Sequence, residues 1–252
     1  MDSQAQERKT AKTRLTEALN TYGGDTKHES VATAIECLVS LNPTPAPARC
    51  EALRDGQWLL ISAPNFPDGE LRADGKYVYT LGRLAFNIFQ PTSLKIVIDR
   101  VIQPVFPISQ TGKQTHDIIV EFTTADENIT PLQGIVYNKG ICSPVNGNIL
   151  QVQFTGGELV PRDQTNREAW NAIFGEQAKS PTIGLKQKLM TLILRMIFGI
   201  VPPQGMEAET GRVSFKMQRS PKGKLKLLYL DEDLRITRGE QGMVLVCQRL
   251  LG

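Results

Sequence analysis

Short segments in which apolar and polar residues alternate recur from Gln57 onward, and they limit the folds that the chain can adopt. Successive side chains of a β-strand point to opposite faces of the sheet, so this period of two gives each strand one apolar and one polar face. Glycine, proline, asparagine and aspartate separate the segments, as turns between short strands require. The clearest examples are residues 94–98, 118–122, 150–154, 213–217 and 225–229. The pattern therefore predicts an antiparallel β-sandwich or β-barrel.

Further segments extend the pattern and favour closure. They are residues 58–61, 77–81, 84–89, 132–137, 234–237 and 244–247. Together the segments predict about nine or ten strands. So many short strands would leave unpaired edges in an open sheet, and a closed barrel removes those edges.

Two helices are expected before the strands. Apolar residues at three- and four-residue spacing, such as Leu15, Leu19, Ile35 and Leu38, indicate one helix on each side of the Gly23-Gly24 pair. A proline-rich segment, residues 42–47, then ends the second helix because proline lacks a backbone donor and restricts the residue before it. The sequence thus predicts a helical hairpin over residues 1–42 and a barrel domain over residues 43–252.

Residues 162–203 interrupt the strand pattern and are expected to form a helical insertion. One helix is predicted at residues 167–174 and a longer one at about residues 183–200. The longer helix carries a wide apolar face beside a narrow polar stripe. Leu189, Ile193, Met196 and Ile197 belong to the apolar face, and Lys188 and Arg195 to the polar stripe. Two interpretations remain open: a helix that plugs or flanks the barrel, or a lid that contacts a membrane with these six residues.

Basic residues are concentrated in residues 179–226, which hold ten Lys and Arg but only two acids. Such a segment attracts anionic lipid surfaces or nucleic acid, although a solvated strand face is an equally good explanation. Single-strand nucleic-acid binders place aromatic rings among their basic side chains. Here Phe215 and Tyr229 alternate onto the same side as Leu225 and Leu227, away from the lysines. A nucleic-acid partner is therefore not expected.

The sequence offers no recognisable catalytic or metal-binding motif. It has no Gly-x-Ser-x-Gly elbow, P-loop or dinucleotide fingerprint, only two histidines, and four widely spaced cysteines. Neither an enzyme nor a cofactor is expected. The acidic trio Asp231, Glu232 and Asp233 is interpreted as a turn between strands whose charges meet Arg235 and Arg238.

Four segments, taken together, resemble the plastid lipid-associated protein (PAP) or fibrillin family, including its cyanobacterial members. They are residues 41–45 (LNPTP), 53–60 (LRDGQWLL), 82–89 (GRLAFNIF) and 229–239 (YLDEDLRITRG). The Gly56-Gln57-Trp58 triplet is also similar to the lipocalin Gly-x-Trp motif, in which the tryptophan closes one barrel end beneath a basic side chain. The resemblance implies a mainly β, lipocalin-like antiparallel barrel, and we expect Arg235 or Arg249 to stack on Trp58.

The family resemblance also implies a function: non-enzymatic binding or carriage of an apolar lipid or isoprenoid, such as a quinone or carotenoid. The expected location is the cytoplasmic or stromal side of the thylakoid, peripheral to a membrane that carries anionic lipid. The rival function is an adaptor that docks to an isoprenoid or quinone biosynthetic enzyme. Large residues on apolar strand faces are the candidate ligand-lining residues, with plain core packing as the alternative role. They are Trp58, Tyr79, Phe86, Phe122, Phe154, Phe215 and Tyr229.

Overall fold

A computed structural model gives the fold of the chain and describes most of its residues. The described residues are 3–64, 66, 68–72, 74–84, 87–126, 129–175, 199–201, 203, 205–220 and 222–250. The helices in these ranges are α1 (Ser3–Thr21), α2 (Glu29–Ser40), α3 (Glu51–Arg54), α4 (Leu81–Leu84) and α5 (Arg167–Phe174), with a 3-10 turn η1 (Pro47–Arg49). No helix in this part of the chain is both long and apolar enough to cross a membrane.

The strands form one antiparallel sheet. Those at its centre are β1 (Gly56–Leu60), β4 (Lys95–Val105), β7 (Ile118–Thr124), β8 (Gln133–Pro144), β9 (Ile149–Pro161), β12 (Lys222–Leu230), β13 (Leu234–Gly239) and β14 (Val244–Arg249). The shorter strands at its margins are β2 (Glu70–Leu71), β3 (Tyr77–Thr80), β5 (Pro107–Ile108), β6 (Lys113–Thr115), β10 (Ile200–Val201) and β11 (Val213–Met217).

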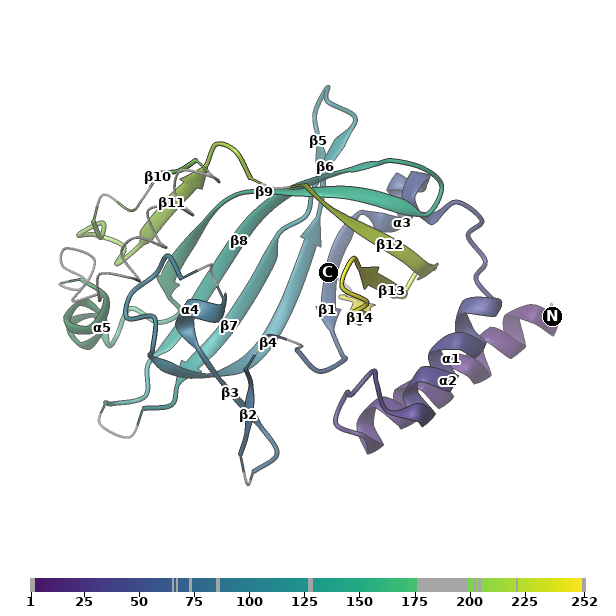
Figure 1. Ribbon diagram of the computed structural model, residues 1–252, viewed down its shortest axis with the longest axis horizontal. Coiled ribbons are helices and arrows are strands. Elements are labelled where there is room, and N and C mark those ends of the chain that lie inside the picture. The colour runs from purple at the N-terminus through teal and green to yellow at the C-terminus, as the bar shows by residue number, and fades with distance from the viewer. Residues whose placement is uncertain are drawn as a thin grey trace.

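The eight central strands close into a barrel, in the order β9-β12-β13-β14-β1-β4-β7-β8 and back to β9 (Figure 1). This architecture confirms the prediction of a mainly β, lipocalin-like barrel with helices. Closure gives each central strand a hydrogen-bonded neighbour on both sides, so the alternation of apolar and polar residues becomes an inner face and an outer face.

Strand β9 is shared between two partners along one of its edges. Its first part pairs with β12, with Leu150 opposite Leu225, and its second part pairs with β11, with Gly157 opposite Phe215. A Cβ atom on Gly157 would come within 2.6 Å of the Phe215 ring and of the Tyr137 carbonyl oxygen, so only glycine permits this approach. Strands β11 and β10 therefore extend the sheet from β9 beyond the point where its pairing with β12 ends.

The helices α1 and α2 pack outside the barrel, at the right of Figure 1. Leu15 and Leu19 of α1 and Leu38 of α2 share a buried cluster with Ile236 of β13 and Val246 of β14. Both helices lie where the spacing of apolar residues predicts them. Gly23 and Gly24 between them have φ angles of 60° and 77°, which favour glycine.

Two local predictions differ from the structure. The strand predicted at residues 84–89 is wrong at the described positions, because Leu84 belongs to α4 and residues 87–89 form no strand. The Asn87 backbone N–H donates to the Gly82 carbonyl, and a Cβ on Gly82 would come within 3.0 Å of the Thr92 carbonyl oxygen. The helix predicted at 167–174 is confirmed as α5. Most of the helix predicted at about 183–200 lies outside the described residues, but Ile200 belongs to β10.

Candidate functional site in the barrel interior

The register of the strands identifies the side chains that point into the barrel. Val101, Val120, Val136 and Leu159 lie opposite one another across β4, β7, β8 and β9, and all four are buried. On the other face of the same strands lie charged groups, for example Arg100 and Glu121 at 2.7 Å from each other. The apolar row is therefore the inner face.

One part of the interior is almost entirely apolar. We call it the apolar half and define it by Val101, Val120, Phe122, Leu159 and Phe215, which belong to one buried cluster. Leu81 and Leu84 of α4 and Trp170 and Phe174 of α5 cover it, and the Trp170 indole donates a 2.9 Å hydrogen bond to the Gly211 carbonyl.

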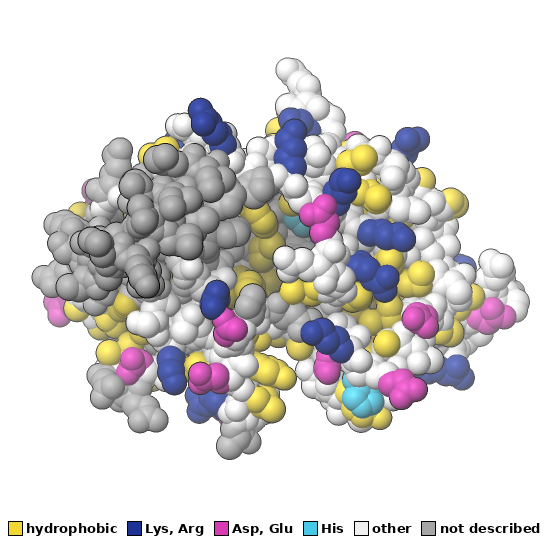
Figure 2. All heavy atoms as spheres, viewed as in Figure 1, with side chains coloured by type: hydrophobic (Ala, Val, Ile, Leu, Met, Phe, Trp, Pro, Cys, Tyr) yellow, Lys and Arg dark blue, Asp and Glu magenta, His cyan; other side chains and the backbone are white. Residues whose placement is uncertain are grey.

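Several side chains of the inner face remain accessible to solvent. Leu60, Ile98, Ile118 and Phe154 pack against the apolar half but are only partly buried. The face of the molecule shown in Figure 2 is hollowed near its centre, over β4, β7 and β8, and hydrophobic side chains line the depth of the hollow. An apolar surface that stays accessible inside a barrel is what an apolar ligand requires.

The other part of the interior is polar. Five buried polar side chains from α3, β4, β6, β13 and the segment before β7 gather around Cys142 and Cys247; we call them the polar end. They are Arg54, Gln103, Gln114, His116 and Arg235. Arg235 donates to the Gln103 side-chain oxygen at 2.5 Å, and Arg54 lies 3.8 Å from the Cys142 sulfur.

Trp58 forms the base of the interior at this end. Its ring is fully buried, and its indole N–H donates to the Arg54 carbonyl at 2.9 Å, which holds α3 against β1. The guanidinium carbons of Arg235 and Arg249 lie 4.9 and 4.3 Å from the centroid of the ring. Both arginines expected at Trp58 therefore stack on it, as cation–π contacts.

The titratable groups of the polar end are held in neutral forms, except for the arginines. Burial lowers the pKa of His116 to about 3, and the nearby charges of Arg235 and Arg54 act in the same direction. Burial raises the pKa values of the Cys142 and Cys247 thiols, although the arginines oppose that shift. At neutral pH the imidazole and both thiols are uncharged, so this arrangement provides neither a thiolate nucleophile nor a charged acid–base pair.

Six of the seven predicted ligand-lining residues fall into three groups. Tyr79, Phe122, Phe154 and Phe215 contact the apolar half, and Trp58 lies at the polar end. Phe86 lies outside the described residues, as do the predicted membrane-contact residues Lys188, Leu189, Ile193, Arg195, Met196 and Ile197. Of the basic strand residues, Lys216, Lys222, Lys224 and Lys226 are exposed.

Tyr229 lies on the outer face, under α1 and α2, so the expectation that it shares a face with Leu225 and Leu227 is wrong. The register of β12 against β13 shifts between Leu227 and Tyr229. A β-bulge of this kind adds one residue to a strand and turns the side chains beyond it to the opposite face.

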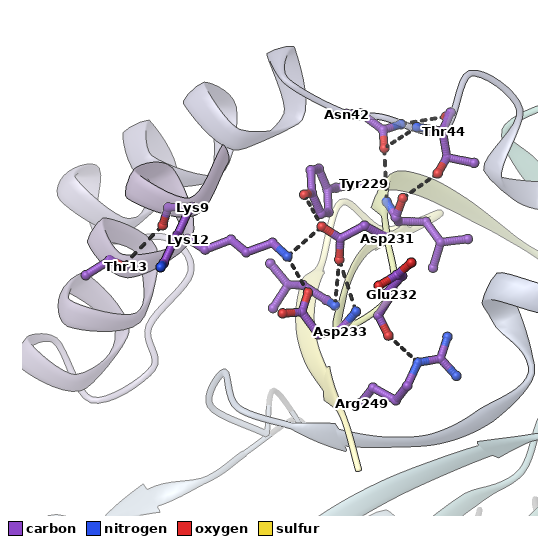
Figure 3. Close-up of polar contacts among 12 residues, drawn as sticks. Lys9, Lys12, Thr13, Asn42, Thr44, Tyr229, Asp231, Glu232, Asp233 and Arg249 are labelled. Atoms are coloured by element: carbon purple, nitrogen blue, oxygen red, sulfur yellow. Dashed lines mark hydrogen bonds and ion pairs between the residues drawn. The ribbon is translucent and has the colours of Figure 1, made fainter. Parts of the chain in front are cut away.

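The acidic trio forms a turn between β12 and β13, as predicted, but its charged partner is different. Asp231 accepts hydrogen bonds from the backbone N–H groups of Asp233 and Leu234 at 3.2 and 2.9 Å. Lys12 of α1 bridges the carboxylates of Asp231, at 2.6 Å, and Asp233 (Figure 3). The expected meeting with Arg235 and Arg238 is wrong, because Arg235 points into the barrel and the helical hairpin supplies the cation.

The polar end contains residues that no sequence pattern identifies. Arg54 lies in a helix of four residues, too short to show a periodic pattern, and Gln103 and His116 stand in segments that have no motif. Among the described residues, no group of three or more His, Cys, Asp or Glu side chains is placed to hold a metal ion.

Comparison with protein-family models finds a match to the family described as PAP_fibrillin over residues 9–248. The match begins within α1 and ends within β14, so it takes in α2 and the other seven strands of the barrel completely. Comparison with curated proteins and with solved structures finds no match.

Proposed function

The chain belongs to the PAP/fibrillin family, and from that premise we propose that it is a non-enzymatic binding or carrier protein for an apolar lipid or isoprenoid held inside the barrel. The family is plastid lipid-associated and generally non-enzymatic. A quinone, a carotenoid or a similar molecule is the proposed class of ligand.

The observation that carries this proposal is the mixed burial of the inner face. Ile98 and Phe154 point to the same side as fully buried Val101 and Leu159, yet they stay partly exposed. A barrel packed only for stability would fill this space with its own side chains, since protein interiors are as dense as organic crystals. Accessible apolar surface inside the barrel therefore supports a ligand.

Native mass spectrometry of the protein purified without detergent from a photosynthetic host tests the proposal. A co-purifying lipid, quinone or pigment at a fixed stoichiometry is the expected result. A protein that carries no ligand but captures a prenyl synthase from the same extract would instead support the adaptor function.

We also propose that the protein works at the surface of the thylakoid membrane, on its cytoplasmic or stromal side. Exposed lysines on two strands that both pair with β9 support this: Lys216 on β11 and Lys222, Lys224 and Lys226 on β12. Each lysine near an anionic bilayer contributes about 1 kcal/mol of attraction at low salt.

Vesicle flotation at low salt tests the membrane proposal. The wild-type protein should float with anionic vesicles and not with neutral ones, and the variant K222Q/K224Q/K226Q should bind about 100-fold more weakly, from about 1 kcal/mol per charge. The matched control, R8Q/K9Q/R14Q on α1, removes the same number of charges from another surface. Equal losses in both variants would show that the attraction depends on net charge and would contradict an assigned membrane face.

A further inference from the structure

Two guanidinium groups are buried in the barrel without a carboxylate partner. Arg54 is 2% exposed and Arg235 is 3% exposed. Within the described part of the chain, neither lies within 4.0 Å of an Asp or Glu oxygen, whereas ten other pairs satisfy that distance. A buried charge is strongly unfavourable unless it is paired and hydrogen-bonded, and arginine keeps its proton in proteins.

The hydrogen-bonding capacity of the polar end is incompletely used. Four buried atoms have no hydrogen-bond partner in the part of the chain that the structure describes: the Nε atoms of Arg54 and Arg235, Nδ1 of His116 and Oε1 of Gln114. Arg54 makes a weak contact to the Cys142 sulfur, and Arg235 donates to Gln103. These atoms belong to four separate parts of the chain: α3, β6, β13 and the segment before β7. The fold brings them together in the same region of the interior.

Arg249, which also stacks on Trp58, is an example of an arginine with a purely structural role in this barrel. Arg249 donates through Nε to the Glu232 carbonyl, and through its two other nitrogens to the carbonyls of Asp55 and Leu53. Its guanidinium ties three chain segments together at the barrel base. Among the described residues, Arg54 and Arg235 do not have such a set of carbonyl partners, although Arg235 contacts the same indole ring.

No neighbouring group within the described polar end offers a negative charge. The thiols of Cys142 and Cys247 stay protonated because burial raises the pKa of each, and His116 is neutral because burial lowers its pKa. Glu51 attracts Arg54 through space but is itself exposed to solvent. The two guanidinium groups therefore leave a positive charge of about two in the interior.

The polar end, which carries this positive charge, lies next to the apolar half. Leu60 of β1 packs against the apolar half and also against the cluster that contains Trp58, Cys142 and Cys247. Leu60 lies opposite Cys247, which in turn lies opposite Arg235 in the sheet. The apolar half and the polar end therefore adjoin at Leu60.

We propose that Arg54 and Arg235 bind an anionic headgroup, a carboxylate or a phosphate, of an amphipathic ligand whose hydrocarbon chain occupies the apolar half. This inference rests on the proposed ligand-binding function and specifies the chemistry of the ligand. A guanidinium group presents several N–H donors in a fork that matches both headgroups. The headgroup supplies the charge and the acceptors that the buried arginines lack.

Calorimetric titration of the delipidated protein with three ligands of equal chain length tests this inference. The ligands are palmitate, hexadecyl phosphate and hexadecanol. We expect at least one of the anionic ligands to bind ten-fold or more tightly than hexadecanol, and the stronger of the two identifies the headgroup as a carboxylate or a phosphate.

Variants then assign the preference to the arginines. R54M and R235M keep a side chain of similar length without charge, so each should reduce the ratio of the affinity for the anionic ligand to the affinity for hexadecanol. R238M, an exposed position on the same strand as Arg235, is the matched control and should keep the wild-type preference.

The outcomes separate this inference from the function on which it rests. Equal affinity of the wild-type protein for all three ligands overturns the headgroup assignment and leaves the binding function intact. An anionic preference that R54M and R235M both retain also overturns it, even if one variant is less stable. Binding of none of the three ligands contradicts the proposed function itself.

Discussion

The two faces of strands β12, β13 and β14 are built from the same alternating sequence. They differ in how completely their apolar side chains are buried and their polar side chains are hydrogen-bonded. On the outer face, Tyr229 and Ile236 are covered by α1 and α2, and Tyr229 donates its hydroxyl hydrogen bond to Asp231. On the inner face, Arg235 keeps an unpaired Nε and Leu225 and Leu245 remain partly exposed. The helices of the chain cover the outer face, whereas some side chains of the inner face remain available for contact with a ligand.

Because of this difference, substitutions on the two faces should affect stability and ligand binding differently. Substitutions under the helices should reduce the free energy of unfolding without changing affinity for a ligand. Substitutions inside the barrel should change affinity, and those at its base should change both.

The largest expected effect is at the barrel base. Trp58→Ala should lower the free energy of unfolding by about 3–5 kcal/mol, as truncation of a buried aromatic residue does. The loss arises because Arg235 and Arg249 stack on the ring and the indole N–H holds α3. Urea unfolding followed by circular dichroism measures it. An unchanged unfolding midpoint would contradict the role of Trp58 in stabilising the base of the barrel.

A smaller effect is expected for the ion pairs of the outer face. Lys12→Met should cost about 0.5–1 kcal/mol at pH 7, the usual range for a partly exposed salt bridge. Burial alone would raise the pKa of Asp231, but hydrogen bonds with Asp233, Lys12 and Tyr229 outweigh it and lower that pKa. A lowered pKa means that the stabilisation is complete above the ordinary value of 3.8 and is lost as the pH falls through the folded-state pKa.

The pH dependence gives the control for this prediction. The difference in unfolding free energy between wild type and Lys12→Met should be constant between pH 5 and 8 and should shrink in acid below pH 3.8. A difference that stays the same in acid would mean that Lys12 contributes through packing of its methylene groups and not through Asp231.

The sequence predicts those features that local pattern determines. Alternation locates strands such as β7 and β11, and three- and four-residue spacing locates α1 and α2. The position of Trp58 at the barrel base follows instead from the resemblance of the Gly-Gln-Trp triplet to the lipocalin motif. Each of these signals is contained within a few residues, and the hydrophobic effect enforces it once a core forms.

The features that sequence does not predict depend on contacts between distant segments. The bulge that turns Tyr229 outward is set by pairing of β12 with β13, and the position of Gly82 depends on a backbone hydrogen bond to the Thr92 carbonyl. The convergence of Arg54 and Arg235 requires closure of the barrel, because their positions are far apart in the chain. The sequence also does not show which buried polar side chains find hydrogen-bond partners and which do not.

The measurement that tests the central claim most directly compares one substitution inside the barrel with one under the helices. Phe154→Ala removes a partly exposed ring from the inner face, and Leu15→Ala removes a buried side chain from the cluster beneath α1 and α2. The Leu15 change should cost about 2–5 kcal/mol of stability and the Phe154 change a similar or smaller amount. Affinity for palmitate is then measured by calorimetric titration under conditions where both variants are folded. The account predicts at least a ten-fold loss of affinity in Phe154→Ala and a change of less than two-fold in Leu15→Ala. Equal affinities in the two variants would contradict the claim that the barrel interior is the binding site.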